Sequence, residues 1–239
     1  MSASFRSHQH VTAARAFLRA WLLWVILGES AGFLAPVLLQ QLGTTLPAAT
    51  AFPLLVAAGL VEGALLGWSQ AHVLRRCLPG LSIGRWTALT SEAAAVAWMI
   101  GLARSEFSHV WTRWPPALQV GVGILAATAL LASIGTAQWL ELRRHVARAW
   151  RWIPATAAAW AAGLLVFLAI STPLWQPGQE PALTALIGVV AGVAMAAVMA
   201  AASGLVMARM VFKETHFRRG PESAHRLVSR HAPLTKGKP

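Results

Sequence analysis

The chain has 239 residues, of which 56% are hydrophobic and only 12% are charged. A soluble domain carries about 25% charged residues, so the composition argues against a soluble protein and indicates a polytopic membrane protein. The net charge of +12 would suit a nucleic-acid partner. Most basic residues, however, lie in short clusters beside apolar segments, the pattern of the positive-inside rule, so we expect a lipid bilayer and no nucleic acid as partner.

Six apolar segments follow one another along the chain. Each is long enough to cross a hydrocarbon core of about 30 Å at 1.5 Å per residue. A segment in lipid must satisfy its own backbone hydrogen bonds, and the alternation of barrel strands is absent, so each segment is predicted to be a helix. The expected fold class is all-α, a bundle of six transmembrane helices. The predicted spans are 17–39, 52–74, 86–103, 117–142, 153–171 and 182–210.

The distribution of basic residues predicts the orientation of this bundle. With the N-terminus inside, 18 of the 20 Lys and Arg residues fall on the cytoplasmic side, and only Arg104 and Arg113 fall outside. We therefore expect an N-in/C-in topology, with residues 17–210 as the membrane domain. Residues 1–16 form a basic cytoplasmic arm, and residues 211–239 a basic tail that is expected to be disordered and close to anionic lipid headgroups.

One motif occurs twice within the apolar segments. Gly67-x-x-Gln70 and Gly135-x-x-Gln138 are each followed by Leu-Arg-Arg four residues after the glutamine. Each copy also has a Trp and, four residues further, a Thr downstream; these are Trp86 and Thr90, then Trp152 and Thr156. Two copies with the same polarity predict a tandem helical-hairpin repeat, with the first and last helices either flanking it or forming a degenerate third pair. The predicted units cover about residues 59–105 and 127–171.

Small residues recur at four-residue spacing on the second and sixth predicted helices. Such faces let helix backbones approach closely in lipid. They indicate packing within the bundle, or oligomerisation of the chain, and the sequence does not separate the two. The glycines that define these faces are Gly59, Gly63, Gly67, Gly188, Gly192 and Gly204.

Three carboxylates fall inside the predicted spans, at Glu29, Glu62 and Glu92. Ionisable groups at such depth are costly, and most face the interior of a bundle or a wet cavity. They indicate a protonatable site or a site for a cationic ligand, with hydrogen bonding between helices as the alternative. Pro36 is expected to bend the first helix near Glu29.

Further ligand-binding candidates come from the repeated motif and its surroundings. Gln70 and Gln138 are expected at the cytoplasmic end of the cavity, or else in hydrogen bonds across helix pairs. Four tryptophans lie within helices and have the shape to stack on a ligand, although packing in a helix crevice is the commoner role of such residues; they are Trp68, Trp98, Trp139 and Trp160, of which Trp68 and Trp139 are taken as candidates.

The outer loop at residues 104–116 predicts a short helix in the interface. Phe107, Val110, Trp111 and Trp114 share one face at helical spacing. Such a helix anchors the chain at the membrane surface or covers a cavity.

Catalytic and metal-binding motifs are absent from the sequence. It has no P-loop, no His-Glu-x-x-His, no Gly-x-Ser-x-Gly, no Asp and a single Cys. We therefore expect no catalytic residues, no metal site, no cofactor and no enzyme activity.

The repeated pattern resembles that of a group of uncharacterised bacterial multi-pass membrane proteins, in which Gly-x-x-Gln-Trp-Leu-x-Leu-Arg recurs. The second copy here, from Gly135 to Arg143, matches in full, whereas the first departs at Ala71 and His72. The resemblance covers about residues 59–163. It implies a location in the bacterial cytoplasmic (inner) membrane and no particular activity.

Two functions remain open from the sequence. The first is a small carrier or ligand-binding membrane protein, a role in transport, with an intramembrane carboxylate site. The second is a non-catalytic accessory or scaffold subunit that docks on a membrane-protein partner or on a second copy of the chain.

Overall fold

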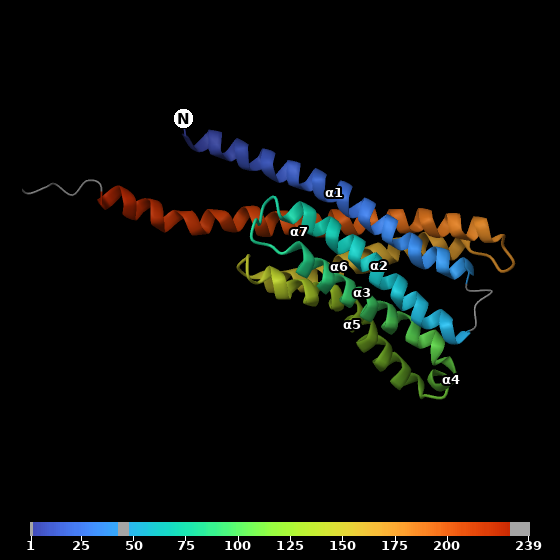
Figure 1. Cartoon of the computed structure of the whole chain (residues 1–239). Helices are drawn as coiled ribbons and strands as arrows, with labels where there is room; N and C mark the ends of the chain where they lie inside the picture. Colours follow the sequence, from blue (N-terminus) through green and yellow to red (C-terminus); the bar gives the residue numbers. More distant parts are fainter. Residues whose placement is uncertain (1, 43–47, 230–239) are drawn as a thin grey trace, which may run out of the picture.

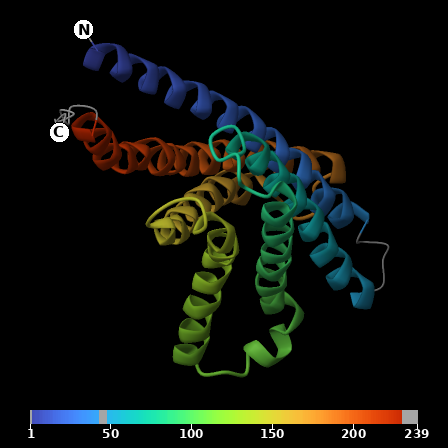
Figure 2. The same cartoon turned by 60° about the vertical axis from the view of Figure 1, so that its left-hand side comes forward.

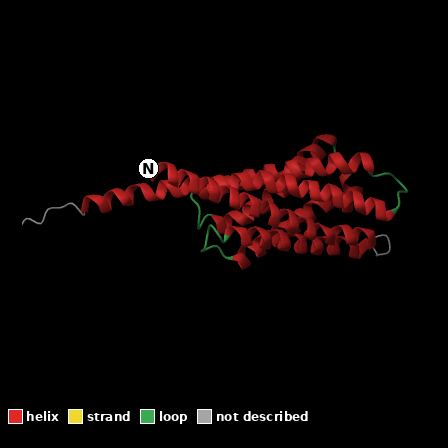
Figure 3. Cartoon of the chain, turned by 90° about the horizontal axis from the view of Figure 1, so that it is seen from above, coloured by secondary structure: helices red, strands yellow, loops and turns green. Residues whose placement is uncertain are grey.

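The computed structural model describes residues 2–42 and 48–229, and the side chains of residues 12–39 and 50–212. A one-turn helix, α4 (Ser108–Trp111), precedes α5, and a short 3₁₀ helix, η1 (Ala149–Arg151), precedes α6. No strand occurs in the described residues (Figure 3), so the all-α fold class is confirmed for them. The long helices are α1 (Ser2–Leu42), α2 (Ala48–Leu74), α3 (Ile83–Glu106), α5 (Pro116–Leu142), α6 (Trp152–Leu174) and α7 (Pro181–Ser229) (Figure 1).

Within the described residues, five helices are long and apolar enough to cross a membrane, judged by length and composition. They are α1, α2, α5, α6 and α7, and they indicate a membrane protein. The helix outside this set is α3, which carries Glu92 and several Ser and Thr residues.

The long helices pack as a closed ring in the order α1, α2, α3, α5, α6, α7 and back to α1. The turns α2–α3 and α5–α6 lie at one end of the bundle, together with the start of α1 and the end of α7 (Figure 1). At the opposite end α3 and α5 diverge toward α4 (Figure 2). Each helix therefore has two neighbours, and the ring encloses a central space.

Glycines bring neighbouring helices into close backbone contact. A methyl group at Gly63 would lie 2.5 Å from Cβ of Ala94, and one at Gly32 would lie 2.8 Å from Cα of Glu62. Because no side chain other than hydrogen fits these positions, α2 can approach both α1 and α3 closely. Gly204 lies against the Trp21 ring in the same way, at the contact between α7 and α1.

Local sequence sets several helix boundaries. The Ser82 hydroxyl caps α3 by accepting from the Arg85 backbone N–H at 3.3 Å, and Pro116 occupies the first turn of α5, where its missing N–H costs nothing. Arg148 adopts a left-handed conformation with φ of 53°, which turns the chain into η1.

Both terminal segments are helical where the structure describes them. Helix α1 begins at Ser2, so the arm expected at residues 1–16 is helical from that residue, and α7 continues to Ser229, past the predicted end at 210. The remainder of the predicted tail, residues 230–239, lies outside the described residues. The expected interfacial helix is present only as the single turn α4, because the chain turns at Thr112 before the Pro115-Pro116 pair.

Candidate functional site

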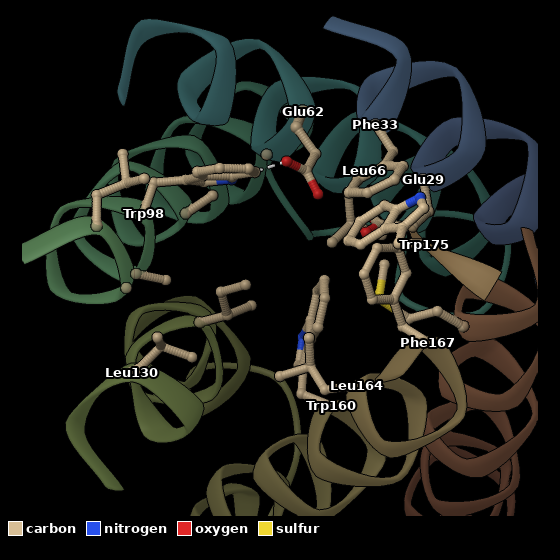
Figure 4. A pocket seen from close by; sticks show the side chains of 17 residues that line it. Glu29, Phe33, Glu62, Leu66, Trp98, Leu130, Trp160, Leu164, Phe167 and Trp175 are labelled. Atoms are coloured by element: carbon tan, nitrogen blue, oxygen red, sulfur yellow. Dashed lines mark hydrogen bonds between the residues drawn. The ribbon is translucent and has the colours of Figure 1, made fainter. Parts of the chain in front are cut away.

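A cavity of about 390 Å³ lies inside the helix ring (Figure 4). Its 17 lining residues come from all six long helices. A volume of a few hundred Å³ with mostly apolar walls and a few polar groups is typical of small-molecule sites.

Glu62 on α2 is the carboxylate with surface open to this cavity. The Trp98 indole on α3 donates a hydrogen bond of 2.8 Å to Oε2 of Glu62 (Figure 4). Gly59 makes room for the Trp98 ring, since a Cβ there would collide with it. A tight glycine contact between α2 and α3 thus seats the indole that orients the Glu62 carboxyl.

Glu29 on α1 faces Glu62, close enough for the two carboxyl groups to interact. The Glu29 side chain is fully buried beside Phe33 and Trp175, whereas Glu62 keeps 6% of its surface exposed (Figure 4). Both oxygens of Glu29 are buried, and no N–H or hydroxyl donor among the described residues reaches them; the Glu62 carboxyl is the polar group that they face. A buried polar group without a donor is costly, so the pair is an incomplete site.

The remaining walls are apolar and largely aromatic. Phe33, Trp160, Phe167 and Trp175 lie on the side opposite Trp98 (Figure 4). Phe167 contacts both Phe33 and Trp175 edge to face, with ring centroids 5.6 and 5.9 Å apart. No Lys, Arg or His is among the residues that line the cavity, so nothing in its walls neutralises the two carboxyl groups.

The lining residues occupy corresponding positions along the helices. Three tryptophans are fully buried, and each donates its indole N–H to a polar residue of a neighbouring helix; the pairs are Trp86 to Gln70, Trp152 to Gln138 and Trp21 to Ser203. The cavity lies a fixed distance along the helices from these three bonds.

On α3, α6 and α1 the residues eight positions after the tryptophan are, in that order, Ala94, Trp160 and Glu29. The residues twelve positions after it are Trp98, Leu164 and Phe33. On the partner helices α2, α5 and α7 the residues eight positions before the acceptor are Glu62, Leu130 and Met195. All nine line the cavity.

The two acids have no counterpart at the corresponding positions of the other helices. Where α1 has Glu29, the matching positions on α3 and α6 hold Ala94 and Trp160. Where α2 has Glu62, the matching positions on α5 and α7 hold Leu130 and Met195. The same kind of helix packing therefore forms with apolar residues at these sites, and packing alone does not require either carboxylate.

The two motif glutamines lie outside the cavity lining and form a buried cluster with each other. Gln138 donates to Gln70 at 2.7 Å and to Thr90 at 3.0 Å, and accepts from Trp152 at 2.8 Å. Gln70 also accepts from Trp86 at 3.2 Å. We call these five residues the glutamine cluster; it joins α2, α3, α5 and α6 next to the turns.

The other candidates also lie away from the cavity. Glu92 is exposed on α3. Trp68 is 43% exposed and contacts the Trp24 and His72 rings, and Trp139 lies under the Arg143 guanidinium at 4.8 Å. Of the three carboxylates within predicted spans, the structure brings together Glu29 and Glu62.

Of the six packing glycines, five have close neighbours inside the chain. Gly59, Gly63, Gly67, Gly192 and Gly204 all face a side chain or backbone within the ring. Gly188 makes only an ordinary contact of 3.7 Å with Trp175.

Of the four tryptophans within predicted helices, Trp98 and Trp160 line the cavity; its other aromatic residues, Phe33, Phe167 and Trp175, were not among the predicted ligand-binding residues. A signal for them exists in the motif itself, since the face that carries Thr156 continues at i+4 to Trp160 and at i+11 to Phe167. The same face of α3 runs from Thr90 to Ala94 and Gly101. The residues on the same helix face as each motif threonine therefore predict the cavity wall.

Chemically, the site offers one oriented carboxyl, a second carboxyl that faces it, and aromatic walls. Among the described residues, no group of three or more His, Cys, Asp or Glu side chains could hold a metal ion. Comparisons with protein-family models, with curated proteins and with solved structures found no match for the chain.

Proposed function

We propose that the protein is a non-catalytic carrier or ligand-binding membrane protein whose ligand occupies the cavity at Glu29 and Glu62. The observation that carries this proposal is a buried carboxyl, Glu29, that has no donor and borders a cavity wide enough for a small molecule. Groups left unsatisfied in a native interior are typical of functional sites.

The asymmetry of the ring supports a functional role for the acids. Leu130 and Met195 stand where α2 has Glu62, so an apolar residue suits that position in the other helix pairs. A carboxylate that packing does not need, and that costs free energy in an apolar wall, is best explained by a ligand or a proton that it binds.

The proposal includes six membrane spans with both termini in the cytoplasm. Helix α3 packs between α2 and α5, and the chain joins it to α2 at one end of the bundle and to α5 at the other. If α2 and α5 cross the membrane in the same direction, α3 must therefore cross it in the opposite direction. The basic turns around Arg75 and Arg143 lie at one end of the bundle (Figure 1), as the positive-inside rule requires for a cytoplasmic face. The tandem-repeat origin, the anionic lipid contacts and the bacterial inner membrane belong to the same proposal.

The alternative role as an accessory or scaffold subunit has less support. In that role the faces with small residues would bind a partner, but most of their glycines already contact neighbouring helices of the same chain. Native mass spectrometry of gently solubilised membranes tests it, because a scaffold subunit would carry a stoichiometric partner and a carrier acting alone would not.

A ligand screen on two matched variants tests the proposed function. Gly101 lines the cavity, and a Cβ there meets only Leu130 at 3.6 Å, so Gly101→Phe places a ring in the cavity. Gly121→Phe is the control, because nothing lies within 4 Å of that position on exposed α5 surface. The screen measures thermal unfolding of the purified full chain in detergent with cationic, neutral and anionic small molecules.

We expect at least one compound to raise the unfolding temperature of the wild type and of Gly121→Phe but not of Gly101→Phe. A ligand that binds only the folded state stabilises it, by about 2–4 °C per kcal/mol for a chain of this size. Failure of every compound, or equal stabilisation of both variants, would contradict a cavity site. Uptake by reconstituted vesicles then separates a carrier from a protein that only binds its ligand.

A further inference from the structure

We propose that the ligand is an organic monocation with an apolar body, and that it binds Glu62 in exchange for a proton held between Glu62 and Glu29. This inference rests on the proposed function and names the substrate class of the same cavity. It follows from the charge, the donor set and the shape of the walls.

The charge of the ligand follows from the titratable residues in the cavity walls. The two titratable residues among the lining residues are Glu29 and Glu62, and no basic side chain lies with them. An anion would add a second negative charge beside the carboxyl pair, and a neutral apolar molecule would leave the charge of the pair without a counter-charge. A cation compensates one negative charge and leaves no new charge in the apolar interior.

The absence of further oxygen ligands in the walls favours an organic cation over a metal ion. Calcium takes about 6–8 oxygen ligands, and magnesium needs a near-octahedral set. Apart from Glu29 and Glu62, the lining consists of Gly, Ala, Leu, Ile, Met, Phe and Trp, whose side chains carry no oxygen. A bare inorganic ion would exchange its hydration shell for too few ligands.

The aromatic walls fit the apolar part of such a cation. Quaternary and protonated amines are attracted to the faces of Trp, Tyr and Phe within about 6 Å of the ring centre. Trp98 approaches the Glu62 carboxyl from α3, while Phe33, Phe167 and Trp175 close the opposite side (Figure 4). A cation with its head at Glu62 therefore shares a cavity of about 390 Å³ with these rings, and its apolar body can lie against them.

An apolar body also suits the open side of the cavity. Gly101 is exposed and lies near the end of α3, and Leu130 stands opposite it on α5. The two helices diverge beyond this point toward α4 (Figure 2). Because Gly101 both lines the cavity and is exposed, a molecule that dissolves in lipid can reach the cavity at this residue without crossing a polar surface.

The two carboxyl groups have different roles in the proposal. Glu62 keeps accessible surface and is oriented by the Trp98 indole, so it contacts the ligand. Glu29 has no accessible surface and acts through Glu62, as a positioning residue. Two facing carboxylates in an apolar wall repel each other strongly, so they share one proton while the cavity is empty, and the remaining oxygens still lack donors.

The exchange conserves charge. When the cation enters, one proton leaves the carboxyl pair for the solvent, and the net charge of the site is unchanged. Helices α3, α5, α6 and α7 contribute no titratable side chain to the lining, so the pair alone sets the dependence on pH. Protons and ligand compete, and cation binding should therefore weaken as the pH falls.

A pair of isosteric probes tests the charge. Benzyltrimethylammonium and neopentylbenzene have the same shape and differ by the charge of one atom, and neither can take up a proton. Isothermal titration of the purified full chain measures the affinity for the ammonium probe, and competition measures that for the hydrocarbon. We expect the ammonium ion to bind at least about tenfold more tightly, which corresponds to a difference of about 1.4 kcal/mol.

Three variants assign the residues. We expect Glu62→Gln to weaken ammonium binding about tenfold or more, because the cation would enter an apolar site without a counter-charge. Glu29→Gln should retain binding down to a lower pH, since Glu62 then has no neighbouring carboxylate to help it hold the competing proton. Glu92→Gln is the matched control, because Glu92 is exposed and does not line the cavity.

The outcomes separate this inference from the function it rests on. Equal binding of the two probes, or unchanged ammonium binding in Glu62→Gln, overturns the cation assignment. If in addition Gly101→Phe prevents binding of a neutral or anionic ligand, the proposed function stands without the cation assignment. If no probe of any charge binds the wild type, both fall.

Discussion

The glutamine cluster and the cavity are two polar regions of one helix ring, and they differ in how their polar groups are satisfied. In the cluster, Gln138 uses both its donor and its acceptor group, with bonds of 2.7, 3.0 and 2.8 Å. In the cavity, Glu29 is equally buried, yet neither of its oxygens has a donor among the described residues.

This difference teaches how to assign roles to buried polar residues in an apolar bundle. A fully paired network stabilises the contact between helices and leaves no capacity for a ligand. An unpaired carboxyl beside an empty volume costs stability in the absence of a ligand and gains a partner in its presence. Substitutions in the two regions should therefore change stability in opposite directions.

The largest expected effect is at Gly67, beside the glutamine cluster. A Cβ at this position would lie 2.8 Å from Cβ of Thr90 and 3.0 Å from Cα of Thr87, so Gly67→Leu must separate α2 from α3. We expect a loss of about 3 kcal/mol in the free energy of unfolding, measured by equilibrium unfolding in mixed micelles. Gly121→Leu, at a position with nothing within 4 Å, is the control. Equal stability of the two variants would show that the helices do not pack this closely.

Gln138→Leu should have the next largest effect. It removes three hydrogen bonds and leaves the Trp152 N–H buried without an acceptor. Hydrogen bonds between helices in membranes contribute about 0.6–2 kcal/mol each, so we expect a total loss of about 2 kcal/mol. Gln119→Leu is the control on the same helix, because Gln119 makes a single bond to the Trp114 carbonyl. Destabilisation of similar size in both variants would contradict a special role for the cluster.

The position of the helices could be predicted from sequence, because apolar length is a local property. The six predicted spans correspond to α1, α2, α3, α5, α6 and α7, and the boundaries agree best where Leu74 and Leu142 precede paired arginines. Whether all six cross the bilayer stays a prediction, since α3 is less apolar than the other five.

The composition of the site was less predictable. The depth of Glu29 and Glu62 follows from their place in the spans, but their meeting depends on the close approach of α1 and α2 at Gly32. Glu92 could have been set aside, because it stands about 200° around the helix from the buried Thr90. The aromatic walls depend on which helices become neighbours in the ring, and that is a long-range property.

Glu29→Gln is expected to stabilise the protein, in contrast to the two preceding variants. The amide has the shape of the carboxyl and donates a hydrogen bond to Glu62 at every pH, whereas the wild-type carboxyl must first take up a proton. We expect the variant to gain about 1 kcal/mol of stability in the absence of ligand, by thermal or detergent unfolding at neutral pH. Glu92→Gln, on the exposed side of α3, should change little. A clear loss of stability in Glu29→Gln would mean that the carboxyl is satisfied in the protein and would remove the main support for a ligand there.

A third buried carboxylate, Glu141, sharpens the comparison because basic side chains and a backbone N–H surround it. It lies at the end of α5 and accepts from the Ser82 backbone N–H at 3.1 Å, while Arg85 Nε lies 3.3 Å away. His145 Nε2 lies 3.2 Å from the same carboxylate, which joins the two basic turns of the bundle.

Arg85→Ala should therefore give the smallest effect, a loss of about 0.5 kcal/mol, since the Arg85 side chain is 42% exposed and solvent screens its charge. The loss should shrink further at high salt, and Arg75→Ala, at an exposed residue of the preceding turn, is the control. The remaining partners of Glu141 explain why so little is lost: the carboxylate keeps the Ser82 N–H and His145 when the guanidinium is removed. A loss several times larger would show that Glu141 depends on one partner, as an isolated buried charge does, and would place it with Glu29 instead of with the glutamine cluster.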